Sequence, residues 1–220
     1  MTGSESSDTT EGNSAPGTDP RLAAAAAMRR LGHAMVAHET DADLLRQIAT
    51  QAAATAAIVE AGPRRTRPVA ELRRQMWESP PPDGGQMAHF VECMVSGQAN
   101  PMGVGMTVRR EGDRAIAEVH LGAAFEGAPL RAHGGVVAAI LDDVMGYVLL
   151  LHRTPAFTGR LTVTYLSATP VQADLIATAW LDRREDRKLH IAGTLETAAG
   201  MAIARAEGLF IAVPADRITG

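Results

Sequence analysis

Residues 133–151 decide the fold, and they read HGGVVAAILDDVMGYVLLL. At about 100° per residue, the large apolar side chains gather on one side of a helix and the small residues on the other. The first side holds Val137, Ile140, Leu141, Val144, Tyr147, Val148 and Leu151, and the opposite side holds Gly135, Ala139, Asp142 and Gly146. The stretch predicts one long helix over residues 133–152 whose large apolar side is covered.

The segments around this helix have the period of strands. Residues 114–121 alternate polar and apolar side chains, and Gly112-Asp113 before them predicts a hairpin turn. The predicted strands cover residues 107–110, 114–121, 160–168, 173–183, 188–197 and 202–213. One apolar helix among several strands is typical of an α+β fold with an antiparallel sheet.

Composition divides the chain into four parts. Residues 1–19 hold almost no apolar side chains and predict a disordered tail. Residues 20–62 are rich in Ala with helical spacing and predict a helical hairpin appended to the main domain. Residues 63–95, rich in Pro, Arg and Gly, predict a connector with a short helix over 69–77. Residues 96–215 then hold the α+β domain.

The charge distribution argues against a nucleic-acid partner. The formal net charge is −4, and four acidic residues of the tail account for all of it. Those residues are Glu5, Asp8, Glu11 and Asp19. A body with balanced charge lacks the basic surface that neutralises phosphates.

The sequence also argues against disulfides, a metal site and a membrane-spanning helix. Cys93 is the only cysteine, which excludes an intramolecular disulfide and a Cys-rich metal site, and we predict no metal. The polar, acidic start predicts no signal peptide. Asp142 and Asp143 interrupt the longest apolar run, so we expect a cytoplasmic protein without a membrane span.

Asp142 is the stronger of two candidate carboxylates. It lies on the small-residue side of the helix, where another backbone or a ligand can approach closely. An ionised carboxylate in so apolar a helix is costly unless it is paired, and functional sites are where such costs are tolerated. Asp143 is expected at the flank of the helix, facing solvent or an edge salt bridge.

The start of the helix is a candidate oxyanion site. The first N–H groups of a helix have no internal partner and meet the positive end of the helix dipole. Without Cβ atoms at Gly134 and Gly135, a carbonyl oxygen can approach them. Asp142 lies about 12 Å further along the helix by rise. One substrate can meet both groups only if the second comes from another subunit, which predicts a homodimer or a dimer of dimers.

An ordered set of motifs follows along residues 96–213: FEGAP at 125–129, HGG at 133–135 with Asp142 after it, TGRLTVTY at 158–165, Pro170, Arg187-Lys188, and AEGLFI at 206–211. The set resembles the hotdog-fold acyl-CoA thioesterases of the PaaI and thioesterase-superfamily type. The resemblance implies an antiparallel sheet wrapped around one long central helix, with active sites at a dimer interface. Many PaaI-type members have an Asn where this chain has Gly127.

The resemblance also implies roles for the site residues. The N–H at Gly134 polarises the thioester carbonyl, and the carboxylate at Asp142 acts as nucleophile or general base toward water. A hydroxyl at Thr158, from the partner chain's half of the site, orients the water or the carboxylate.

Three further positions complete the predicted site. His133 shapes the loop and bonds on the carbonyl side, Gly135 lies with the substrate, and Arg187 and Lys188 meet the CoA phosphates. CoA is part of the substrate, so no separate cofactor is implied.

Two alternatives remain open. A non-catalytic acyl-CoA-binding hotdog protein would keep the pocket without needing Asp142. A hotdog hydratase or dehydratase would need a His and a carboxylate on the substrate's α and β carbons. The sequence argues against a serine hydrolase, because the chain has no Gly-x-Ser-x-Gly elbow.

Overall fold

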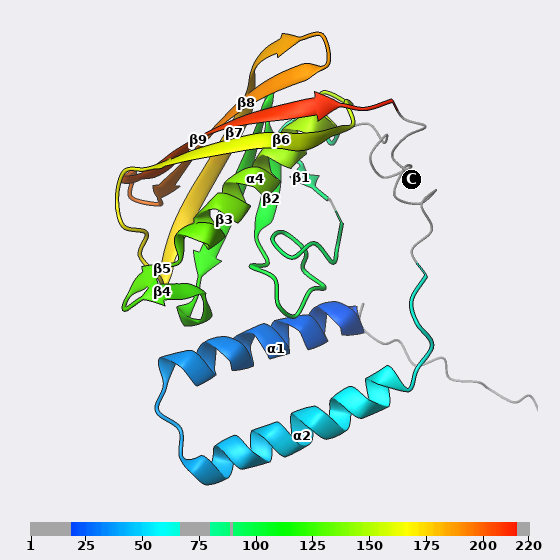
Figure 1. Ribbon diagram of the computed structural model, residues 1–220, viewed down its shortest axis with the longest axis vertical. Helices are drawn as coiled ribbons and strands as arrows, with labels where there is room; N and C mark the ends of the chain where they lie inside the picture. The colour runs from blue at the N-terminus through cyan, green and yellow to red at the C-terminus, as the bar shows by residue number, and fades with distance from the viewer. Residues whose placement is uncertain (1–18, 67–79, 89, 215–220) are drawn as a thin grey trace, which may run out of the picture.

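The computed structural model describes residues 19–66, 80–88 and 90–214 (Figure 1). Of the predicted disordered tail, residues 1–18 lie outside the described residues, and Asp19 accepts a hydrogen bond from the Arg21 N–H as the N-cap of α1. The predicted short helix over residues 69–77 also lies outside them.

A seven-stranded sheet in the order β1-β2-β3-β7-β8-β9-β6 dominates the structure, and all of its neighbouring strands are antiparallel. Its strands are β1 Gln86–Met87, β2 Thr107–Glu111, β3 Arg114–Leu121, β6 Ala156–Tyr165, β7 Ala173–Glu185, β8 Lys188–Thr197 and β9 Ala202–Ala212. The short elements before the central helix are η1 Ala123–Phe125, β4 Glu126–Ala128 and β5 Arg131–Ala132. The helices are α1 Pro20–Ala37, α2 Ala42–Glu60 and α4 Gly134–Leu151.

The sheet wraps around α4, as the sequence predicted (Figure 1). Of the seven large side chains predicted to face the core, six are buried, and Met145 and Leu149 join them. By length and composition alone α4 could cross a membrane, a test that the core helices of folded domains also pass. Here its burial beneath five strands of the sheet is that of a core helix.

Strand β6 begins four residues before the predicted strand, at Ala156. The predicted strand started at Arg160, directly after Gly159. In the structure Gly159 lies in a β-bulge, where the register shifts between Thr158 and Arg160. A Cβ at Gly159 would lie 3.2 Å from the Ile211 side chain. The glycine therefore permits a bulge inside the strand rather than ending it.

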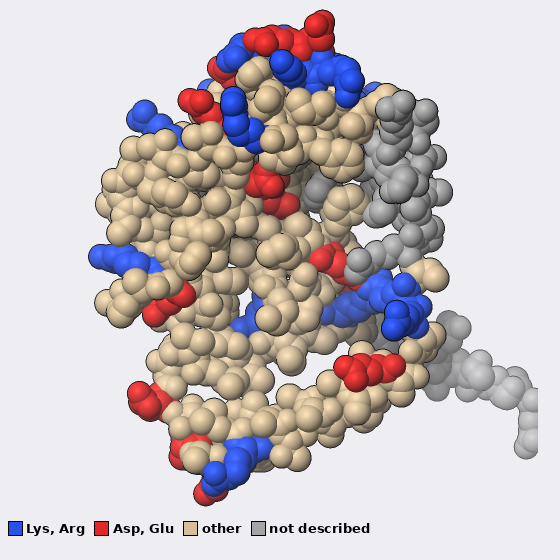
Figure 2. Space-filling view, in the orientation of Figure 1, with Lys and Arg blue, Asp and Glu red and all other residues tan. Residues whose placement is uncertain are grey.

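The N-terminal extension is held to the domain by α1. Arg29 donates to the carbonyl oxygens of Gln98 and Asn100, at 2.9 and 2.7 Å. The His33 ring accepts the Ala124 N–H at 3.1 Å and packs edge-on against Phe125. In α2 every described side chain is at least partly exposed, and this helix lies on the far side of α1 from the sheet (Figure 1 and Figure 2).

Close packing of β9 on α4 gives a test of the core. A Cβ at Gly208 would lie 2.6 Å from the Phe210 ring and 2.8 Å from the Met145 sulfur. We expect Gly208→Ala to lower the free energy of unfolding by about 1–3 kcal/mol, since overpacking forces neighbours to move.

Gly146→Ala is the matched control, because a Cβ there meets no atom within 4 Å. It should raise the free energy of unfolding by about 0.5–1 kcal/mol, the usual gain of Ala over Gly inside a helix. Urea unfolding of both variants checks the pair. Equal changes in the two would contradict the packing described here.

Candidate active site

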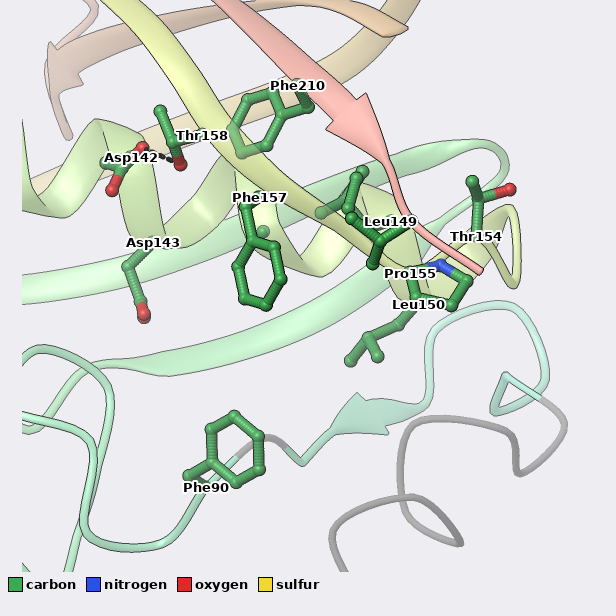
Figure 3. A pocket seen from close by; sticks show the side chains of 13 residues that line it. Phe90, Asp142, Asp143, Leu149, Leu150, Thr154, Pro155, Phe157, Thr158 and Phe210 are labelled. Atoms are coloured by element: carbon green, nitrogen blue, oxygen red, sulfur yellow. Dashed lines mark hydrogen bonds between the residues drawn. The ribbon is translucent and has the colours of Figure 1, made fainter. Parts of the chain in front are cut away.

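Asp142 and Thr158 form the polar centre of the candidate site. The Thr158 hydroxyl donates to Asp142 Oδ1 at 2.9 Å, a bond that joins the small-residue side of α4 to the start of β6 (Figure 3). Burial raises the pKa of Asp142 above its usual value, the Thr158 hydrogen bond opposes this shift, and the Asp143 charge adds to it. A carboxylate with a raised pKa and one hydroxyl partner is a candidate general base or nucleophile.

An apolar cleft of about 300 Å³ begins at this carboxylate. It runs along α4 past Gly146 to Leu150, and Phe157 and Phe90 line it from two different segments (Figure 3). Because a Cβ at Gly146 would meet no atom within 4 Å, the small-residue side of the helix is an open wall of the cleft. An apolar group attached to a reacting carbonyl can therefore extend away from Asp142 along the helix.

Asp143 does not face solvent or an edge salt bridge, so that prediction was wrong. The Cys93 thiol donates to Asp143 Oδ1 at 3.2 Å, and Asp143 Oδ2 is buried without a hydrogen-bond partner among the described residues. The cause is the segment of residues 90–105, which covers this flank of α4. Cys93 itself is half-buried.

His133 caps the start of α4 and thereby selects one free donor. Its Nδ1 accepts the Gly135 N–H at 2.9 Å, and its carbonyl accepts the Val136 N–H at 2.9 Å. The Gly134 N–H has no acceptor among the described residues, so it is the donor that a carbonyl oxygen can meet. A Cβ at Gly135 would lie 3.0 Å from the His133 ring, so this glycine makes room for the cap.

Two neighbours fix this helix start in place. The Tyr165 hydroxyl donates to the Gly134 carbonyl at 2.8 Å. On the other side, a Cβ at Gly127 would lie 2.8 Å from the His133 Cα. No side chain fits at Gly127. The packing of His133 therefore requires glycine here, and the Asn that many PaaI-type members have at this position would not fit.

The two halves of the predicted site lie at opposite ends of β6 within one chain. Thr158 near the start of the strand holds Asp142, and Tyr165 at its end holds Gly134. Thr158 therefore bonds to Asp142 of its own chain, and the prediction that this hydroxyl comes from the partner chain's half of the site was wrong. Asp142 and Gly134 remain about 12 Å apart by helical rise.

Arg187 and Lys188 lie away from the carboxylate, at the turn between β7 and β8. The Arg187 guanidinium donates to the Ala212 carbonyl at 3.1 Å. Lys188 is opposite Ile211 on β9, which is in turn opposite Phe157 on β6. Two strand spacings separate Lys188 from Phe157, about 10 Å.

Sequence reasoning missed Tyr165, Phe157 and Phe90. Tyr165 closes the quoted TGRLTVTY motif, but no local pattern shows that its hydroxyl reaches back to Gly134. Among the described residues, no group of three or more His, Cys, Asp or Glu is placed to hold a metal ion.

Comparison with known proteins identifies the class. Residues 131–204 match the model of the thioesterase superfamily. Human acyl-coenzyme A thioesterase THEM5 is 33% identical over 70 residues, which are 32% of this chain and 28% of the human protein. The resemblance to the thioesterase superfamily and the hotdog fold that were predicted from the sequence are confirmed.

Two solved structures are also similar to this chain. Protein RHA08564, a thioesterase superfamily protein, superimposes with a TM-score of 0.74 at 25% identity, covering 90% of this chain and 93% of its own. The PaaI protein of E. coli has a TM-score of 0.48 at 15% identity, covering 50% of this chain and 81% of its own. A match to 90% of the chain extends well beyond residues 96–215, so the first structure shares part of the N-terminal extension.

The Thr158 hydrogen bond gives a test by pH. The bond lowers the pKa of Asp142 against the effect of burial, so Thr158→Val should raise that pKa further. If Asp142 acts as the anion, the acid limb of kcat/KM should move to higher pH in this variant. Thr164→Val, on the same strand, is the control and should leave the limb in place. If the Thr158→Val profile coincided with the wild-type profile, the hydrogen bond would have no effect on the group whose titration sets the acid limb.

Proposed function

We propose that the protein hydrolyses acyl-CoA thioesters to the free acid and CoA. The single observation that carries this proposal is the Thr158–Asp142 pair at the head of an apolar cleft. Membership of the thioesterase superfamily and the similarity to an acyl-CoA thioesterase support the reaction class.

The site supplies the groups that thioester hydrolysis needs. The Gly134 N–H, at the positive end of α4, donates to the carbonyl oxygen as negative charge develops on it. As a general base, Asp142 takes a proton from a water that attacks the carbonyl carbon. The C–S bond then breaks, and the CoA sulfur leaves as the thiolate and takes up a proton. As a nucleophile, Asp142 would instead form an anhydride that water hydrolyses to the same products.

The reaction requires two copies of the chain, because Gly134 and Asp142 lie too far apart on one helix. Strand β6 is the edge of the sheet, and its ten residues include the exposed Phe157 and Tyr165. A long exposed edge strand is a ready template for pairing with another strand. Antiparallel pairing of two β6 strands about their midpoints places the start of one opposite the end of the other. This brings Asp142 of one copy toward Gly134 of the partner subunit.

The bulge at Gly159 makes this arrangement possible. Thr158 and Tyr165 are separated by an odd number of positions, so a regular strand would point them to opposite faces. One extra residue at the bulge restores the same face, and both side chains reach α4. A β6 pair therefore presents both halves of the site on the helix side of the joined sheet.

The CoA portion of the substrate would meet the basic turn of Arg187 and Lys188. Both residues lie at the end of the sheet that Phe157 shares. Their charges suit the CoA phosphates, and their contribution would be to KM rather than to kcat, as expected for uniform binding.

A non-catalytic acyl-CoA-binding protein is the alternative. It would use the same cleft and the same carbonyl donor, but it would have no need for a half-buried carboxylate with a raised pKa. The position of Asp142 on the cleft wall, paired to Thr158, favours catalysis over binding alone.

Asp142→Asn tests the proposal. The variant keeps the shape of the side chain and removes the base or nucleophile, so kcat on acyl-CoA esters should fall by about 10²–10⁴-fold. Release of free CoA thiol measures the rate. Binding of a non-hydrolysable acyl-CoA analogue should survive, since the cleft and the Gly134 N–H are unchanged.

Asp143→Asn is the matched control. Its carboxylate is directed at Cys93 and away from the reacting carbonyl, so kcat should stay within a few-fold of wild type. Wild-type turnover in Asp142→Asn would overturn the mechanism, and retained binding of the analogue would then favour the binding protein.

A further inference from the structure

The outer wall of the cleft comes from the N-terminal side of the chain. Phe90 lines the cleft opposite Phe157 and Leu150 (Figure 3), although it precedes β2 and lies outside the part of the chain that matches the superfamily model. Three residues later, Cys93 bonds to Asp143 on α4. The segment of residues 90–105, here called the cleft loop, therefore meets the cleft at two points.

Hydrogen bonds within the cleft loop give it a fixed shape. The Ala99 N–H donates to the Val91 carbonyl at 2.8 Å, and the Gly105 N–H donates to the Val95 carbonyl at 2.8 Å. The Gln98 side chain donates to the Gly105 carbonyl at 2.9 Å and to the Met106 carbonyl at 3.0 Å. These bonds tie the loop into one piece, so an anchor on its middle controls the position of Phe90.

That anchor is Arg29 on α1. Its guanidinium donates to the carbonyls of Gln98 and Asn100 in the middle of the loop. Gly105 has φ +74°, and a Cβ there would lie 3.2 Å from the Arg29 Nε, so the loop backbone approaches the guanidinium closely. Charge-assisted bonds of this kind are stronger than neutral ones. Helix α1 is itself held about one turn further along by His33, which accepts the Ala124 N–H.

We propose that the N-terminal extension sets the size of the acyl group that the cleft accepts. Phe90 closes the cleft, and Arg29 positions Phe90 by holding the cleft loop. This inference rests on the proposed thioesterase function, because it names the substrate class of the same site.

The chemistry of the cleft indicates an apolar acyl chain of intermediate length. The wall is apolar beyond Asp142, Asp143 and Thr158 apart from Thr154 at its far end. From Asp142 to Leu150 the helix rises by about 12 Å, and the cleft volume is at the small end of the range for ligand pockets. A longer chain would have to displace Phe90.

A series of saturated acyl-CoA esters from acetyl to palmitoyl tests the proposal. In the wild type, kcat/KM should rise by up to about fourfold per methylene until the chain reaches Phe90, and then fall. Phe90→Ala should move the maximum to longer chains, with a gain of about tenfold for palmitoyl-CoA and little change for acetyl-CoA. Gly146→Ala places a methyl group in the cleft and should move the maximum to shorter chains.

The positioning role of Arg29 has its own matched pair. Arg29→Met keeps the aliphatic stem but loses both hydrogen bonds, so its length profile should shift in the direction of Phe90→Ala. Arg30→Met, at the exposed neighbouring position, should keep the wild-type profile. Urea unfolding midpoints confirm that each variant is folded.

The outcomes separate this inference from the proposed function. A wild-type enzyme that hydrolyses the series, with a Phe90→Ala profile of the same shape, would overturn the role of the extension and leave the thioesterase intact. A wild type that hydrolyses no ester would overturn the thioesterase. Titration calorimetry of the same esters with the Asp142→Asn protein, with and without Phe90→Ala, would then test by binding whether Phe90 limits the chain length. If Phe90→Ala left the dependence of affinity on chain length unchanged, the proposed role of Phe90 would be wrong.

Discussion

The helix α4 has to bury one face and leave the other open, and the rest of the structure follows from this division. Its large side chains are covered by the sheet at a gain of about 1.5–3 kcal/mol for each that is fully buried. The small-residue face keeps room for a ligand, and the Thr158 hydroxyl offsets part of the cost of placing Asp142 there. Burial that stabilises the domain thus also fixes the carboxylate on the wall of a cleft.

The same helix separates the two halves of the site. The Gly134 N–H lies at its first turn and Asp142 two turns on, so no single substrate carbonyl meets both in one chain. Strand β6 links the two points, with Thr158 and Tyr165 as its contacts to α4. In the proposed dimer, this strand would be both the joined edge of the sheet and the link between the two half-sites.

Periodicity predicted most of the fold because it is a local property. The helix over residues 133–152 and the strand over 114–121 have strong patterns, and the structure places them within a residue of those bounds. The strand predicted from Arg160 started four residues too late, since the bulge at Gly159 depends on the neighbouring strand. Asp142 could be chosen from the helical wheel, whereas the bonds of Asp143 to Cys93 and of Tyr165 to Gly134 join residues 50 and 31 positions apart. No spacing rule reaches such pairs.

In the proposed enzyme, each site takes Gly134 from one copy and Asp142 from the other. Gly134→Pro removes the N–H at the first helical position, where Pro is tolerated, and His133 before it already has the extended backbone that Pro requires. The decisive measurement is the thioesterase activity of a one-to-one co-expression of Gly134→Pro and Asp142→Asn chains. Random pairing makes half of the dimers mixed, each with one intact site of two, so the mixture should recover about a quarter of the wild-type rate. A mixture as inactive as either variant alone would contradict the shared site.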